Sequence, residues 1–110
     1  MHPGDKTIII IVPGAENQDQ EQNFVPKKAE VQLGVNNLVI WKNTGDIGHT
    51  ITLDIPYKDL YSGEFGSPGI ILPDKSYQFL FTKEVKIKYH CEPHPWMRGE
   101  IDMIHGALTS

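Results

Sequence analysis

One short segment of the chain contains residue types that bind soft metal ions. It reads YHCEPHPWMRGEI, residues 89–101, and it places Cys91, His94 and Met97 at intervals of three. Cys91 is the only cysteine, which excludes an internal disulfide, a four-thiolate zinc or iron–sulfur site and a C-x-x-C redox pair. From its residue type alone, Cys91 is a buried core thiol, a nucleophile or a metal ligand.

The spacing around Cys91 favours a metal ligand. A thiolate, imidazoles and a thioether are donors that copper accepts as both Cu(I) and Cu(II). The gaps in Cys91-x-x-His94-x-x-Met97 allow a tight loop around one ion, and Pro93 and Pro95 restrict that loop before a metal binds. A core thiol would leave His94 and the prolines unexplained, and a catalytic Cys–His dyad would lack a third orienting group. Zinc would also fit these donors, and we interpret any zinc bound there as adventitious rather than native.

The elements that position these residues are expected to be strands. The eight prolines and ten glycines are spread through the chain and leave no window for a long amphipathic helix. Short β-branched or alternating runs are separated by turn residues and occupy residues 7–12, 29–33, 38–43, 49–53, 77–81, 85–91 and 99–104. This pattern predicts an all-β sandwich or barrel.

The chain is expected to form a single domain over residues 1–110, with flexible tails at 1–6 and 105–110. Two stretches lack a strand pattern. Residues 13–23 are polar and are expected to form a surface loop, and residues 56–69 are expected to form a long connection with room for one irregular helical turn.

Alternation along residues 85–91 predicts which side chains face the core. The apolar residues Val85, Ile87 and Tyr89 are every second residue and are expected to face the core, so Cys91, two positions after Tyr89, also points inward. His90 points to solvent with the intervening lysines. His49 begins another alternating run. We therefore expect the ends of two strands to bring His49 close to Cys91 and His94.

Taken together, these segments resemble the cupredoxins, the small blue-copper proteins, and most closely their amicyanin/plastocyanin-like branch. YHCEPHPWMRGEI resembles the Cys-x-x-His-Pro-x-Met-x-Gly ligand loop in its shortest form. WKNTGDIGHTITL resembles the strand pair that supplies the first histidine, and NFVPKKAEVQLG and SGEFGSPGIILPDKSYQFLF resemble flanking strands. The resemblance implies a Greek-key β-sandwich of the cupredoxin type that binds one copper ion per chain, with the ligands His49, Cys91, His94 and Met97.

Two residues beside the expected ligands depart from the family pattern. Thr50 follows His49 where the family commonly has Asn, and Glu92 follows Cys91 where a small polar residue is usual. Pro93 has no N–H, so the Thr50 amide is the expected hydrogen-bond donor to the thiolate. Glu92 is expected to act through its charge or a hydrogen bond to Thr50. A single donor to the sulfur and the negative charge of Glu92 both predict a lowered reduction potential.

The resemblance implies a non-enzymatic carrier that moves single electrons between protein redox partners. Pro95 and Trp96 are expected to form its docking surface beside the exposed edge of His94. One alternative is a redox enzyme acting on a nitrogen oxide or oxygen species, with an open axial copper position in place of Met97. A second alternative is a copper carrier that exchanges Cu(I) readily.

Charge and hydropathy limit the other partners. The formal charge is −4 and the basic residues are scattered, which argues against nucleic acid or an anionic membrane as the partner. The longest apolar run, residues 8–12, is far shorter than a membrane span, so no membrane insertion is expected. The resemblance implies an extracytoplasmic location, periplasmic or at the cell surface, with any signal or anchor removed.

Overall fold

The structure is a computed structural model that describes residues 6–15, 17, 23–55, 57–59, 61–66, 69–83, 85–92 and 94–104. This part of the chain contains strands and no helix, so the all-β prediction is confirmed. The strands are β1 (Lys6–Ile11), β2 (Phe24–Val25), β3 (Lys28–Gln32), β4 (Leu38–Asn43), β5 (Thr52–Leu53), β6 (Lys58–Asp59), β7 (Gly63–Glu64), β8 (Ser76–Leu80), β9 (Lys86–His90) and β10 (Arg98–Ile104). Among the described residues, no helix is long and apolar enough to cross a membrane.

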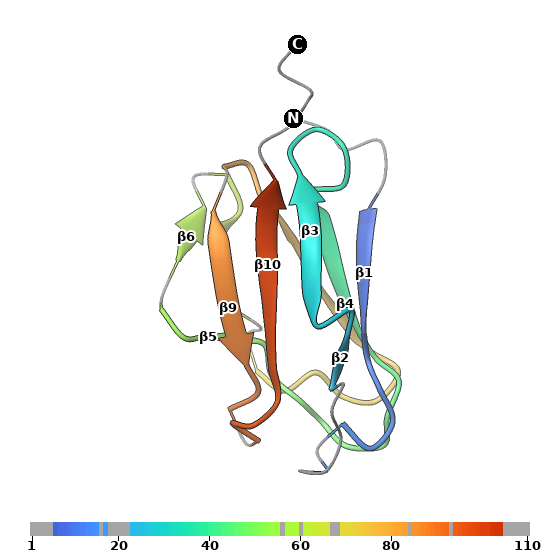
Figure 1. Ribbon diagram of the computed structural model, residues 1–110. Coiled ribbons are helices and arrows are strands. Elements are labelled where there is room, and N and C mark those ends of the chain that lie inside the picture. The colour runs from blue at the N-terminus through green and yellow to red at the C-terminus, as the bar shows by residue number, and fades with distance from the viewer. Residues whose placement is uncertain are drawn as a thin grey trace.

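Two four-stranded sheets form the sandwich (Figure 1). One has the strand order β2-β1-β4-β8 and the other has the order β3-β10-β9-β5. The pairs β1–β4 and β3–β10 are parallel, whereas β9 is antiparallel to both β10 and β5. The loop between β9 and β10 lies at the lower end of the sandwich in Figure 1, and it is the segment that contains Cys91, His94 and Met97.

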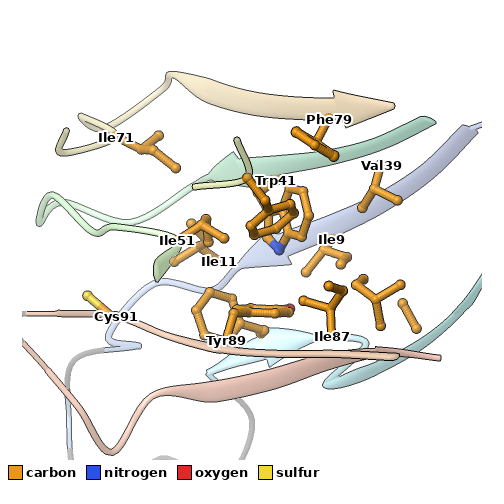
Figure 2. Packing of buried hydrophobic residues seen from close by; sticks show 14 of the residues in the cluster. Ile9, Ile11, Val39, Trp41, Ile51, Ile71, Phe79, Ile87, Tyr89 and Cys91 are labelled. Carbon is orange, nitrogen blue, oxygen red and sulfur yellow. The ribbon is translucent and has the colours of Figure 1, made fainter. Parts of the chain in front are cut away.

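The core lies between the two sheets (Figure 2), and in β4 and β9 every second side chain is buried in it while the others are half-buried or exposed. Trp41 of β4 is fully buried, and its ring packs edge-on against Tyr89 of β9 and against Phe65. Gly99 lies opposite Tyr89 on β10, and an added Cβ there would overlap the Tyr89 ring. Glycine at position 99 therefore lets the ring lie across the neighbouring strand.

A buried carboxylate fastens the β6–β7 hairpin to the chain after β8. Asp59 is 1% exposed and accepts hydrogen bonds from the amides of Tyr61 and Ser62, from the amide and hydroxyl of Thr82, and from the hydroxyl of Tyr57, at 2.8–3.1 Å. Burial raises the pKa of this carboxyl, but the hydrogen bonds from Thr82, Ser62 and Tyr61 lower it more. The resulting pKa is about 2, below the ordinary 3.8.

Several expected boundaries were wrong. Residues 49–53 do not form one strand, because His49 makes an isolated bridge to Ile71 and β5 is only Thr52–Leu53. Lys6, which was expected in the N-terminal tail, begins β1. The described part of 56–69 contains the short strands β6 and β7 in place of a helical turn. Residues 1–5 and 105–110, and most of the expected loop 13–23, lie outside the described residues.

Candidate metal centre

Cys91 directly follows β9 and is held by the first turn of the ligand loop. Ile87 and Tyr89 of β9 are buried and Cys91 is fully buried, as alternation predicted. Figure 2 shows Cys91 at one end of the core cluster. The Cys91 amide donates to the carbonyl of Met97 at 3.1 Å, which closes the loop 91–97. Within it, the amide of His94 donates to the Cys91 carbonyl at 3.1 Å and that of Met97 to the His94 carbonyl at 2.8 Å.

His49 is held by a bridge to a distant segment. Its amide donates to the carbonyl of Ile71 at 3.2 Å, and the Ile71 amide donates to the His49 carbonyl at 2.6 Å. The side-chain amide of Asn43, at the end of β4, donates to the carbonyls of Ile71 and Ile47. His49 is fully buried, and both its backbone N–H and its backbone carbonyl are hydrogen-bonded to Ile71. Its ring therefore has little freedom to move.

The structure brings together three of the four residues expected as ligands, with donor atoms at metal-binding separations. Cys91 Sγ lies 3.6 Å from His49 Nδ1 and 3.5 Å from His94 Nδ1. One ligand atom from each of the three residues lies within 4.8 Å of the others. A sulfur and a nitrogen bound at ordinary lengths in a trigonal plane lie about 3.8 Å apart. The observed separations therefore fit a single ion bound by one thiolate and two imidazoles.

The burial of the donors differs in a way that matters for function. Cys91 and His49 are fully buried, whereas His94 is half-buried. Trp96 is 39% exposed, and its ring packs edge-on against His94 with the ring centroids 5.5 Å apart. Pro95 is also exposed. Met97 is fully buried, which agrees with either a core residue or an axial ligand.

Thr50 contacts the Cys91 sulfur, and Glu92 contacts Thr50. The Thr50 amide donates to Cys91 Sγ at 3.4 Å, as expected, and the Glu92 amide donates to Thr50 Oγ1 at 2.8 Å. Glu92 Oε2 lies 3.1 Å from His90 Nε2, so this side chain lies along the surface rather than among the three donors. Pro93 lies outside the described residues.

Three residues near the site were not indicated by the sequence: Asp54, Arg98 and Asn43. Asp54 Oδ1 lies 2.6 Å from His90 Nδ1 and Asp54 Oδ2 lies 3.2 Å from Arg98 Nη1, and Asn43 supports the bridge of His49 to Ile71. His90 was expected to face solvent, but its side chain is only 17% exposed because Asp54 and Glu92 cover it. The sequence pattern does not indicate the contacts of Asp54 with His90 and Arg98, or that of Asn43 with Ile71, because these partners lie far apart along the chain.

Comparison with known proteins places this geometry in a known fold. No family model matches the chain. It is 28% identical over 76 residues to amicyanin from Paracoccus denitrificans, across 66% of this chain and 53% of that protein. The chain thus spans about half the length of this curated relative.

Two solved structures have a similar fold. A novel purple cupredoxin from Nitrosopumilus maritimus superposes with a TM-score of 0.71 at 24% identity, over 90% of this chain and 100% of that chain. Amicyanin from Paracoccus versutus gives a TM-score of 0.62 at 22% identity, over 94% of this chain and 85% of that one. The chain has the cupredoxin fold, and its resemblance to the cupredoxins and to their amicyanin-like branch is confirmed.

Proposed function

We propose that this protein of the cupredoxin fold binds one copper ion and carries single electrons between protein redox partners. The observation that carries the proposal is the cluster of one thiolate and two imidazoles, whose ligand atoms lie within 4.8 Å of one another. Bound copper would supply a one-electron Cu(I)/Cu(II) couple. The proposed ligands are His49, Cys91, His94 and Met97.

The surroundings of the donors support a carrier. A site that changes little between oxidation states needs ligands that are fixed before the electron arrives. The bridge of His49 to Ile71 and the hydrogen bond from the Cys91 amide to Met97 provide this fixation. Among the described residues, one backbone amide donates to the sulfur, that of Thr50, and a single such donor leaves electron density on the thiolate and favours Cu(II).

The half-buried ring of His94 is the proposed exit for electrons. It is the most exposed of the three clustered donors, and the exposed Pro95 and Trp96 lie beside it in the loop. We propose that these two residues belong to the docking surface for a protein partner. We place the protein outside the cytoplasm, as the resemblance implies, and fractionation of the source cells would test this location.

Electron self-exchange tests the carrier function directly. When Cu(I) and Cu(II) forms are mixed, NMR lines of residues near the metal should broaden in proportion to the concentration of the oxidised form. Replacing Trp96 with Asp should slow this exchange, because it places a charge on the surface where two molecules meet. Absence of exchange broadening in the wild type would contradict the proposal. Rapid loss of Cu(I) to a chelator would favour the copper carrier instead.

Replacing Met97 with Leu should raise the reduction potential and alter the ratio of the two thiolate-to-copper absorption bands. A thioether is a weak axial donor, so its removal changes the electronic state of the site more than its affinity for copper. The measurements are voltammetry and visible absorption, with azide and nitrite added to the wild type as probes of an open position. Those anions should change nothing.

The opposite results for Met97→Leu and for the added anions would favour a redox enzyme over an electron carrier. If Met97→Leu has no spectroscopic effect and small anions perturb the wild-type spectrum, solvent holds the axial position. Redox chemistry on a nitrogen oxide or oxygen species would then be the better account of the site.

A further inference from the structure

One carboxylate contacts both ends of the ligand loop. His90 immediately precedes Cys91 and Arg98 immediately follows Met97, and the two are direct partners in the β9–β10 register. Asp54 Oδ1 lies 2.6 Å from His90 Nδ1, and Asp54 Oδ2 lies 3.2 Å from Arg98 Nη1. The two oxygens of Asp54 thus join the residues that enter and leave the loop 91–97.

The backbone of Asp54 is itself fixed to the same sheet. Its amide donates to the carbonyl of Lys88 at 3.0 Å, which continues the β5–β9 pairing by one residue. An anchored backbone leaves the carboxylate little freedom, so the two contacts cost less side-chain entropy than those of a mobile surface pair. The Asp54 side chain is 29% exposed, so its effect on the loop is expected to come from two simultaneous contacts made from a fixed backbone position rather than from burial.

The contacts continue from His90 to the thiolate. Its second nitrogen, Nε2, lies 3.1 Å from the carboxylate of Glu92, whose amide donates to Thr50 Oγ1 at 2.8 Å. The amide of Thr50 in turn donates to Cys91 Sγ at 3.4 Å. Asp54 is thereby connected to the sulfur through His90, Glu92 and Thr50, as well as through the backbone.

We propose that Asp54 is a positioning residue of the metal centre, which holds the two ends of the loop 91–97 together. The inference rests on the proposed function only in taking this loop to be the metal-binding one. Asp54 does not belong to the donor cluster, so it acts on the retention of the ion and the rigidity of the loop. Groups that hydrogen-bond metal ligands directly change metal affinity by about 10–100-fold, and since Asp54 acts through the neighbours of the ligands, we expect an effect at the lower end of this range.

The experiment compares Asp54→Ala with a matched control, Asp102→Ala. The Asp102 carboxylate also lies on this sheet, pairs with Lys28 Nζ at 3.7 Å and has the same side-chain exposure, 29%. Its register partner on β9 is Lys86, at the end of the strand away from the loop. The two variants therefore remove carboxylates of equal exposure, of which Asp54 contacts the loop end of β9 and Asp102 lies level with its other end.

Two quantities are measured: the rate of copper loss to a chelator, and amide hydrogen exchange in the copper-free proteins. Asp54→Ala should lose copper about tenfold faster than the wild type. It should also accelerate exchange of the Cys91 and Met97 amides. Asp54→Asn, which keeps the shape and one acceptor oxygen, should give intermediate values and serves if the alanine variant does not fold. Asp102→Ala should match the wild type in both measurements.

Equal behaviour of Asp54→Ala, Asp54→Asn and the wild type in both measurements would overturn the proposal. So would equal changes in the Asp102 control, because the effect would then be that of any ion pair on this sheet. Failure of the proposed function is separately visible. A wild type without a thiolate-to-copper band would refute the copper site, whereas hydrogen exchange in the copper-free proteins would still report on the loop.

Discussion

Replacing Cys91 with serine should abolish the intense visible band that Cu(II) produces and should greatly weaken copper binding. The band requires a thiolate bonded to the metal, and a serine hydroxyl is a hard, protonated donor that cannot replace it. His49 and His94 would remain, so weak binding without the band is the expected state of the variant. The measurement is a visible absorption titration with Cu(II), beside the wild type.

The variant must be shown to fold, because Cys91 is fully buried. Burying a hydroxyl in place of the thiol should cost about 1–3 kcal/mol in the free energy of unfolding. Circular dichroism of the metal-free protein checks that the strands are retained. A folded Cys91→Ser protein that kept the wild-type band would rule out Cys91 as the thiolate ligand.

Replacing Asp59 with alanine should lower the free energy of unfolding by about 4 kcal/mol. The substitution removes the buried carboxylate that is the common acceptor of the amides of Tyr61, Ser62 and Thr82, and with it three partly buried hydrogen bonds to a charged group. Urea denaturation of the metal-free protein measures the loss. Asp46→Ala is the control, since Asp46 is exposed, and it should change stability by less than about 0.5 kcal/mol.

The same carboxylate predicts a pH dependence of stability. The pKa of Asp59 is about 2 in the folded protein, against 3.8 ordinarily, so the ionised form stabilises the fold above pH 4. This stabilisation, about 2 kcal/mol, is lost as the pH falls from about 4 towards about 2. In Asp59→Asn the contribution is absent, so its stability should fall less than that of the wild type over this range. Parallel curves for the two proteins would contradict the assignment.

The part of the site that depends on local sequence was predictable. In β9 charged and apolar residues alternate, so the inward direction of Cys91 followed from strand geometry alone. The loop from Cys91 to Met97 is short, and its turns are made among its own residues. Such contacts leave a pattern in the sequence that can be read without the rest of the chain.

The part that depends on distant residues was not predictable. His49 was assigned to a strand start, but its position comes from Ile71 and from the side chain of Asn43. Asp54 and Asp59 look like surface carboxylates, and their roles appear only when Arg98 and Thr82 approach them. Strands of two residues, such as β2, are too short for alternation to be recognised.

The most direct test of the copper centre is an absorption titration of the metal-free wild-type protein with Cu(II). An intense visible thiolate-to-copper band should grow linearly and stop growing at one equivalent, since the described residues contain one cluster of one thiolate and two imidazoles. Only weak absorption at every Cu(II) concentration, or a band that saturates at another stoichiometry, would contradict the proposed copper centre.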